Sequence, residues 1–506
     1  MTACWVRRGA GLVGLGKAWH ETFASPAEAD AWWADLVASL DPATHPGLSA
    51  TPSPTSDPSS GATRGPDPDL RRDPRPTPGP RPGPVAFVSF PFDPGHTTSR
   101  CHVVVPQTVV GRGHGAGWVT SWGDPPVGLV TASVSTHAGA GHPAGSAVAT
   151  TGPQPLRRRE DLSPLVDRAI AIDSARGRAN TATFDPGALD RTGAPTGAVT
   201  FGPGALDHTA WLAAVERALA LIERGDLAKV VLARDELARC DRPLDVAGLL
   251  DRLHRDHPES WTFAVAGLVG ATPELLVRRD HGRVSSRVLA GTIRAATDRP
   301  GAGDNLGDSN PQPLAPVLTT PRDGGPKNAL TGDPDAQAHA LATSAKDLAE
   351  HDFAVASVVD ALAPHCTNLT VSETPFVLRL PNVFHLASDI AGTTRSGASV
   401  LQLAAAVHPS AAVCGTPTAA ARQAIRGLEG FDRGRYAGPV GWVGADGDGE
   451  IGLALRCGQV LDATSLRLFA GCGIVRGSDP AAEWAEAAAK LVPMERALAE
   501  ATPGAA

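Results

Sequence analysis

The chain has 506 residues, and 42% of them are apolar, which is enough for a large core. Its 53 acidic residues outnumber its 45 basic ones, and this balance argues against a nucleic-acid-binding protein, which usually carries a basic patch. The seven cysteines are scattered without a CxxC pair, the glycine-rich N-terminus is too brief for a signal peptide, and no run approaches the roughly 18 apolar residues of a membrane helix. We therefore expect a cytoplasmic protein without a disulfide framework or a zinc site.

The N-terminal part of the chain combines short ordered segments with a long Pro-rich stretch. Residues 25–40 are predicted to form a helix, because Ser25 can cap it and Glu28 completes a capping box. Strands are predicted at 84–94, 101–111 and 117–122. Residues 41–84 have almost no large apolar side chains, and they are predicted to be a disordered insert because they cannot offset the entropy of ordering.

From residue 209 onward the sequence predicts separate helices and hairpin strands. Helices are predicted at 210–223, 246–254, 342–362 and 399–407 and from Pro480 onward, and strands at 229–237, 261–265, 274–278, 282–288, 371–380 and within 438–475. A second Pro- and Gly-rich insert is predicted at about 298–335. Strands joined by hairpins, together with separate helices, predict an α+β fold built on antiparallel sheet.

Two of the predicted helices carry carboxylates that suit a divalent metal ion. One presents Glu350 beside small and apolar side chains, and the last helix presents Glu483, Glu486 and Lys490 on one face. Mg²⁺ prefers hard oxygen ligands and usually takes only one or two protein carboxylates. The simpler interpretation is that both sets form surface salt bridges, Glu350 with Lys346 and Glu486 with Lys490.

Three further side chains could take part in chemistry or could be structural. In the predicted strand 450–457, Arg456 alternates with small residues, so it could project into a cavity and bind a carboxylate, or it could lie at a sheet edge. Lys229 opens a strand and could be a solvated edge lysine, and Glu274 could be a turn carboxylate. The Gly-Cys-Gly element at 471–473 lacks the context of a nucleotide fingerprint, so we expect no phosphate site.

Nine segments of the C-terminal part carry a more specific signal. They are KVVLAR (229–234), GATPELLVRR (270–279), VLAGTIR (288–294), SAKDLAEHDFAV (344–355), LPNVFHLASDIAG (380–392), HPSAAVCGTP (408–417), LEGFDRGRYAGPVGWV (428–443), GDGEIGLALRC (447–457) and AGCGIVRGSDPAAEWAEAAAKL (470–491). In order and spacing they resemble the chorismate-utilising enzymes, the family of anthranilate, aminodeoxychorismate, isochorismate and salicylate synthases. The N-terminal segments GLGKAWHETF and AFVSFPFDP are similar to the isochorismate branch.

The resemblance implies a fold and a set of roles. The fold is α+β, with two large antiparallel β-sheets packed together and helices outside; residues 1–204 would form its N-terminal part and residues 205–497 the chorismate-binding catalytic region. Glu350 and Glu486 would bind Mg²⁺, with Glu483 close by, and the ion would hold the ring carboxylate of chorismate. The carboxylates of chorismate would contact Arg456, Lys490 and the backbone amides of Gly473, Ala290, Gly291 and Thr292, and His385 would contact the reacting region of the ring.

Two positions distinguish the branches of the family. Lys229 stands where isochorismate and salicylate synthases carry a lysine that activates water, whereas anthranilate-type enzymes carry glutamine there. Ala290 stands where aminodeoxychorismate synthases carry a nucleophilic lysine. The resemblance therefore implies an isomerase that converts chorismate to isochorismate: Lys229, as a neutral amine, deprotonates the water that attacks C2, and Glu274 protonates the departing C4 hydroxyl.

Three alternatives stay open at this point. A salicylate synthase, which also eliminates pyruvate, would share Lys229 and Glu274. An anthranilate-type enzyme would use ammonia and a glutaminase partner, and a third possibility is a protein that binds chorismate without catalysis. Ser410-Ala411 departs from the usual Thr-Pro of its motif, which bears on efficiency more than on reaction class. We expect a monomer without a glutaminase subunit, nucleic acid or membrane as partner, serving menaquinone biosynthesis rather than a siderophore pathway.

Overall fold

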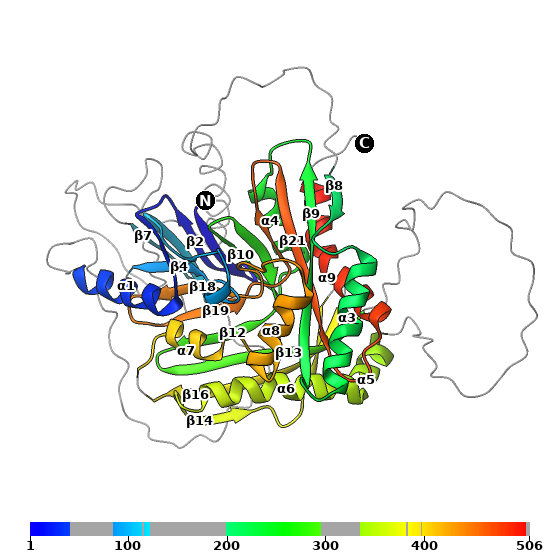
Figure 1. Ribbon diagram of the computed structural model, residues 1–506. Helices are drawn as coiled ribbons and strands as arrows, with labels where there is room; N and C mark the ends of the chain where they lie inside the picture. The colour runs from blue at the N-terminus through cyan, green and yellow to red at the C-terminus, as the bar shows by residue number, and fades with distance from the viewer. Residues whose placement is uncertain are drawn as a thin grey trace, which may run out of the picture.

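The computed structural model describes residues 1–40, 84–113, 116–121, 199–294, 334–380, 383–395 and 397–501. In this part of the chain the strands form two antiparallel sheets, one of eleven strands and one of ten (Figure 1). The predicted α+β class, with two large antiparallel sheets and helices outside them, is confirmed.

The eleven-stranded sheet brings the beginning and the end of the chain together. From edge to edge it consists of β17 (Gly415–Thr416), β9 (Lys229–Cys240), β21 (Ser465–Ile474), β20 (Cys457–Val460), β11 (Leu268–Thr272), β10 (Trp261–Val265), β1 (Ala3–Arg7), β2 (Ala10–Leu15), β6 (Thr108–Gly113) and β7 (Ala116–Ser121), and β8 (Val199–Pro203) pairs with β9. The long antiparallel pairing of β9 with β21 places Val230 opposite Ile474 and Val231 opposite Gly473. Lys229, the first residue of β9, therefore lies near the glycine-rich end of β21.

The ten-stranded sheet is built from the remaining strands. Its order is β14 (Cys366–Val371), β16 (Val383–Thr394), β13 (Arg283–Arg294), β12 (Leu275–Asp280), β19 (Gly449–Leu453), β18 (Pro439–Gly444), β4 (Val85–Ser89), β5 (Cys101–Val105) and β3 (Trp19–Phe23), and β15 (Phe376–Arg379) pairs with β16. The pairing of β13 with β16 shifts register between Ala290 and Thr292, so Gly291 is the extra residue of a β-bulge.

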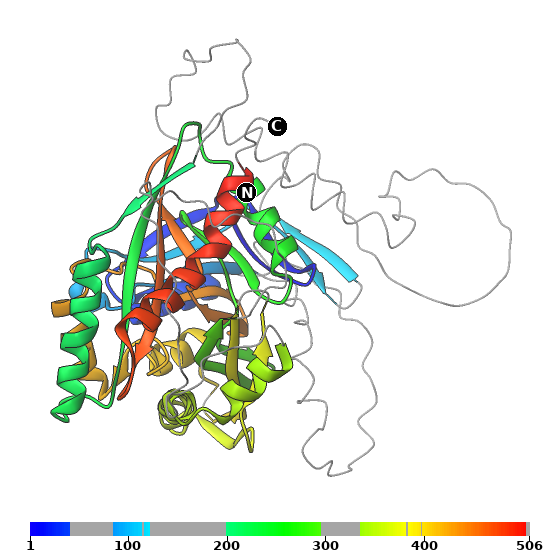
Figure 2. The same cartoon turned by 90° about the vertical axis from the view of Figure 1, so that its right-hand side faces the viewer.

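Helices cover the two sheets on their outer faces. Against the eleven-stranded sheet lie α3 (His208–Glu223), α4 (Val246–Asp256), α8 (Thr418–Leu428) and α9 (Pro480–Ala501); against the other lie α1 (Pro26–Ser39), α5 (Pro334–Thr343), α6 (Ala345–Leu362) and α7 (Val400–Val407). Figure 2 shows α9 running obliquely along its sheet. None of the helices in the described ranges has the length and apolar character needed to cross a membrane.

The inner faces of the two sheets pack on each other through one continuous apolar cluster. Trp5 of β1 reaches across this interface, and its indole Nε1 donates a hydrogen bond of 2.9 Å to Glu450 Oε2 of β19. Gly452 leaves the room for this ring, because a Cβ there would lie 2.9 Å from Trp5 Cη2. The indole thus buries a large apolar area while its only donor is satisfied.

Several predicted boundaries are corrected by the structure. The helix predicted at 342–362 is two helices, because the Ser344 side chain caps α6 by accepting a hydrogen bond from the Asp347 amide, and α5 ends one residue earlier. The predicted strand 450–457 ends at Leu453, after which the chain crosses to the other sheet and Arg456 takes a left-handed φ of 48°. Glu274 precedes β12 and does not belong to it.

Other elements were not predicted, or lie outside what the structure describes. The sequence patterns did not indicate β16, α8 or the three N-terminal strands β1, β2 and β3. The predicted inserts at 41–84 and 298–335 fall almost entirely outside the described residues, and α5 begins at Pro334, inside the second of them. Strands from both sides of residue 204 share both sheets, and the division at that residue stays a prediction.

Candidate active site

A pocket lined by both sheets, α6 and α9 collects most of the residues that the sequence singled out. Its volume is about 670 Å³, counting the space open to solvent. Its lining includes the predicted residues Glu274, Ala290, Thr292, Glu350, His385, Arg456, Gly473 and Lys490. The other predicted site residues, Lys229, Gly291, Glu483 and Glu486, are not part of this lining.

Lys229 is completely buried behind the pocket wall, so the interpretation as a solvated edge lysine is wrong. Its Nζ lies 3.3 Å from Glu350 Oε1 and donates a 3.4 Å hydrogen bond to the Glu350 carbonyl oxygen. Gly473 makes this pairing possible, because a Cβ there would lie 2.7 Å from Glu350 Cδ and 3.1 Å from Lys229 Cε. Glu350 is buried as well, and its predicted alternative partner Lys346 is bonded elsewhere.

Glu274 is a buried carboxyl group that remains protonated at neutral pH. Burial raises the pKa of Glu274 to about 8, although the charges of Lys229 and Lys490 and a hydrogen bond with the Leu289 backbone act in the opposite direction. The group lies in the connection between β11 and β12, where its own amide donates to Thr272 Oγ1 at 3.2 Å. A carboxyl group in this state can donate a proton to a leaving group.

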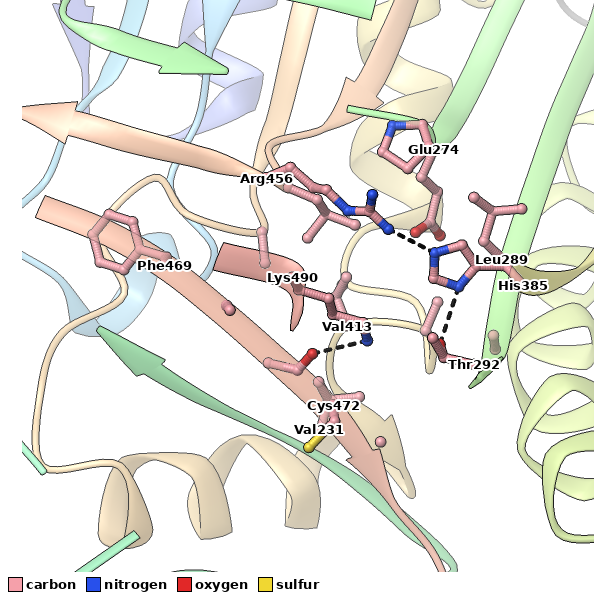
Figure 3. A pocket seen from close by; sticks show the side chains of 18 of the residues that line it. Val231, Glu274, Leu289, Thr292, His385, Val413, Arg456, Phe469, Cys472 and Lys490 are labelled. Atoms are coloured by element: carbon pink, nitrogen blue, oxygen red, sulfur yellow. Dashed lines mark hydrogen bonds between the residues drawn. The ribbon is translucent and has the colours of Figure 1, made fainter. Parts of the chain in front are cut away.

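Arg456, His385 and Thr292 form a line of hydrogen bonds along one side of the pocket (Figure 3). Arg456 Nη2 lies 2.8 Å from His385 Nε2, and because a guanidinium only donates, Nε2 accepts. His385 Nδ1 therefore carries the proton and donates to Thr292 Oγ1 at 3.0 Å. Burial and the charges of Arg456 and Lys490 hold the pKa of His385 well below its usual range, which is consistent with this neutral tautomer.

Arg456 is a buried cation with space in front of it. The residue is 7% exposed and lines the pocket, and burial lowers the pKa of Arg456 to about 10, so it stays charged at neutral pH. Figure 3 shows Glu274, His385 and Arg456 gathered on one side of the pocket, with Lys490 reaching in from α9. Arg456 thus lies in the pocket lining, whereas the predicted strand 450–457 ends at Leu453, three residues before it.

Three carboxylates from α6 and α9 each have a lysine against them. Lys229 pairs with Glu350, Lys346 with Glu483 at 2.6 Å, and Lys490 with Glu486 at 2.8 Å; these six residues come from three elements. Lys490 Nζ also donates to the Gly471 carbonyl oxygen at 3.0 Å. The predicted salt bridge from Glu486 to Lys490 is therefore present, but it lies beside the pocket and is largely buried.

The carboxylates of α6 and α9 are the type of ligand that a divalent cation prefers, although in the part of the chain that the structure describes the ligand atoms of these three residues do not all lie within 4.8 Å of one another. Burial, together with the negative charges of Glu483 and Glu350, raises the pKa of Glu486 to about 7 despite the ion pair with Lys490. Glu483 is 1% exposed, and its Oε2 has no hydrogen-bond partner. At least one carboxylate oxygen here therefore lacks a hydrogen-bond donor, and such oxygens are the hard ligands that Mg²⁺ prefers. A bound ion would compete with the lysines that now hold these groups.

Another set of metal-type ligand atoms lies away from the pocket. Asp280, His281 and Asp448 bring their ligand atoms within 4.8 Å of one another at the turns that follow β12 and β18. Asp448 is already held by Arg279 at 2.6 Å and by the His281 amide at 2.8 Å. These contacts explain why Asp280, His281 and Asp448 lie close together: the side chain of Asp448 connects the two hairpin turns.

The pocket also contains residues that the sequence analysis did not select. Tyr436 is 5% exposed and stacks on Phe469 with ring centroids 5.0 Å apart, and both line the pocket. Its hydroxyl lies 3.2 Å from the place where a Cβ on Gly471 would be. One signal could have drawn attention to Tyr436: it is the single tyrosine of the chain, and it falls within the quoted segment 428–443.

Two large antiparallel sheets with this pocket between them define a chorismate-utilising type of protein. The profile of the family described as chorismate binding enzyme matches residues 191–496, and the chain belongs to that family. The matched range contains all the residues discussed above for the pocket, from Lys229 to Lys490.

Known relatives of the chain carry isochorismate synthase names. It is 37% identical to isochorismate synthase DhbC of Bacillus subtilis over 56% of this chain and 66% of that protein, and 34% identical to isochorismate synthase MenF of the same organism over 57% and 55%. The match thus spans less than two thirds of these relatives. Among solved structures, the menaquinone-specific isochorismate synthase MenF from Escherichia coli superposes with a TM-score of 0.60 at 22% identity, covering 98% of this chain and 88% of that one.

Proposed function

We propose that this chain is an isochorismate synthase, an isomerase that adds water at ring carbon 2 of chorismate and releases the hydroxyl at carbon 4. The observation that carries the proposal is the pairing of a completely buried lysine, Lys229, with a buried carboxylic acid, Glu274, whose pKa is about 8. Glu274 lines the pocket, and Lys229 is buried against Glu350 and next to Gly473, which both line the same pocket. The relatives named DhbC and MenF support the same reaction.

The pocket supplies cations for a substrate with two carboxylates. Arg456 is oriented by its hydrogen bond with His385 and lines the pocket, where its guanidinium can bind a carboxylate. Lys490 contributes a second positive charge from α9. Because Thr292 Oγ1 accepts from His385 Nδ1, the hydrogen of the Thr292 hydroxyl can be donated to a group of the bound ring.

Lys229 and Glu274 divide the proton transfers of the reaction. Lys229 is assigned as the general base, which takes a proton from the water that attacks carbon 2. Glu274 gives its proton to the hydroxyl that leaves carbon 4, which requires that it be protonated at working pH, as its raised pKa ensures. The bonds broken and formed are alike, so the reaction is close to balanced and reversible.

Glu350 and Glu486, with Glu483 beside them, would hold Mg²⁺, in keeping with the burial of Glu350 and Glu483 and with the unpartnered Glu483 Oε2. When bound, the ion would neutralise and orient the ring carboxylate of chorismate. The chain's own contribution is to present these oxygens from two helices and to keep Lys229 in contact with Glu350.

Product analysis tests the proposal directly. The purified protein is incubated with chorismate and Mg²⁺, and the products are separated by chromatography. Isochorismate as the product supports the assignment. Stoichiometric fluorescent salicylate would instead show a salicylate synthase, and ammonia-dependent anthranilate would show an aminating enzyme. Chorismate that is bound but unchanged would show a binding protein.

We further propose that the product enters menaquinone biosynthesis and that the enzyme acts as a monomer without a glutaminase subunit. The solved MenF from Escherichia coli is described as menaquinone-specific and supports this pathway, whereas the solved DhbC from Bacillus anthracis is described as 2,3-dihydroxybenzoate-specific and supports a siderophore pathway as the alternative. Complementation of a bacterial strain that cannot make menaquinone for lack of isochorismate tests the pathway. Light scattering during gel filtration tests the monomer, and a dimer mass would contradict it.

A further inference from the structure

The β-bulge beside the pocket is held in an unusual backbone conformation. Gly291 has a φ of 75°, in the left-handed region that favours glycine, and its neighbours Ala290 and Thr292 both line the pocket. A Cβ on Gly291 would lie 3.0 Å from both Cβ and the carbonyl oxygen of Asp347, so α6 packs directly on the bulge. The bulge therefore depends on α6 for its shape.

His351, one turn further along α6, ties the helix to both strands of the bulged pair. Its imidazole is 1% exposed; Nδ1 lies 3.2 Å from the Ala290 carbonyl oxygen of β13, and Nε2 lies 2.8 Å from Ser388 Oγ of β16. A carbonyl oxygen only accepts hydrogen bonds, so Nδ1 carries a proton. This hydrogen bond holds the carbonyl group of Ala290, the residue that immediately precedes the bulge.

A continuous set of contacts leads from His351 to the cation that would bind substrate. The peptide unit of Ala290 leads into Gly291 and Thr292, the Thr292 hydroxyl holds His385 at 3.0 Å, and His385 holds Arg456 at 2.8 Å. The Thr292 amide is also bonded to Asp347 of α6. Each link joins buried or largely buried groups, so a shift at Ala290 is transmitted along the line.

We propose that His351 is a positioning residue for substrate binding: it holds the Ala290 carbonyl and thereby fixes the bulge that aligns Thr292, His385 and Arg456. The proposal rests on the proposed function, since it takes Arg456 as the group that binds a carboxylate of chorismate. The two ring nitrogens of His351 have partners on different strands, so its imidazole joins β13 to β16 at the bulge.

Three variants separate positioning from packing. His351→Leu removes both hydrogen bonds, His351→Asn retains a side-chain amide that can donate to the Ala290 carbonyl, and Ser388→Ala removes only the contact at Nε2. Ser286→Ala is the matched control, because Ser286 is buried on the same strand β13 and bonds the Leu275 carbonyl oxygen away from the pocket. Chorismate affinity by calorimetry, KM, kcat and thermal unfolding are measured for all four.

The leucine variant is expected to bind chorismate on the order of tenfold more weakly, the effect of losing an oriented buried hydrogen bond, with KM changing more than kcat. The asparagine variant recovers most of the affinity, Ser388→Ala loses about twofold to tenfold, and Ser286→Ala equals the wild type. Wild-type affinity in folded His351→Leu overturns the proposal, as does an asparagine variant as weak as leucine. If the leucine variant does not fold, the chorismate affinity of Ser388→Ala serves as the test. An affinity of Ser388→Ala equal to that of Ser286→Ala then overturns the proposal.

A spectroscopic readout keeps this inference separate from the proposed function. In protein labelled with ¹⁵N-histidine, the His351 signal, identified by its loss in His351→Asn, is expected to show a protonated Nδ1. An unprotonated Nδ1 overturns the proposal whatever the reaction is. If the wild type forms no isochorismate, the proposed function fails, while the Nδ1 signal and the effects on chorismate binding still report on His351.

Discussion

Replacing Gly473 by alanine adds a single methyl group at the most crowded point of the candidate active site. The backbone tolerates the change, because Gly473 lies in the extended strand β21 opposite Val231 and has no left-handed φ. The new Cβ would lie 2.7 Å from Glu350 Cδ, whereas favourable carbon–carbon contacts need roughly 3.5–4.0 Å. The Glu350 carboxylate must therefore retreat by about 1 Å, and Lys229, whose Cε would be 3.1 Å away, is displaced with it.

A misplacement of about 1 Å in a catalytic group costs on the order of a hundredfold in rate, or about 2.7 kcal/mol of transition-state stabilisation. We expect Gly473→Ala to lower kcat/KM for isochorismate formation by that amount and to raise the Mg²⁺ concentration needed for half-maximal rate. Gly427→Ala is the matched control, since Gly427 is exposed on α8 with no atom within 4 Å of its added Cβ. Unchanged kinetics and Mg²⁺ dependence in folded Gly473→Ala would refute the reasoning from packing.

Three further predictions concern the proposed chemistry. Lys229→Ala is expected to abolish turnover while leaving chorismate binding largely intact, and retained turnover in a chromatographic assay would contradict the assigned base. Glu274 acts in its protonated form, so kcat should fall as the pH rises through about 8, and Glu274→Gln should lose turnover at every pH; a pH profile without this limb would remove Glu274 as the acid. Chelation of the metal with EDTA should stop turnover. Glu486→Ala should weaken Mg²⁺-dependent binding, so that a titration needs more Mg²⁺ to reach half-maximal rate; an unchanged Mg²⁺ requirement would show that the metal lies elsewhere.

The fold class followed from the sequence because local patterns are sufficient for it. The capping residues Ser25 and Ser344 and the alternation within strands such as β4 depend on near neighbours, and the helix α1 begins as Ser25 predicts. The unpredicted elements have weaker local signals. The strand β16 is buried along its first half, so its sequence lacks the alternation of apolar and polar residues that marks a half-exposed strand. It lies between β13 on one side and β14 and β15 on the other, and its extended conformation depends on these partner strands.

The arrangement of charges in the site could not be predicted from spacing. The expected neighbour pair of Glu350 and Lys346, four residues apart, does not form; Glu350 pairs instead with Lys229, 121 positions away, and Lys346 with Glu483, 137 positions away. Surface pairs on one helix gain little free energy, whereas a buried carboxylate must find a cation or a hydrogen-bond donor, so tertiary packing decided these partners.

The sequence by itself determined to which family the chain belongs and which residues are candidates for its chemistry, because motifs such as KVVLAR and VLAGTIR retain their order and residue types along the chain. Only the tertiary structure decided that Lys229 is buried, that Gly473 makes room for it, and that Arg456 sits where the chain crosses between sheets. The physical reason is that burial, steric room and the pKa of Glu274 all depend on atoms from strands and helices that are remote in sequence and meet only in the folded protein.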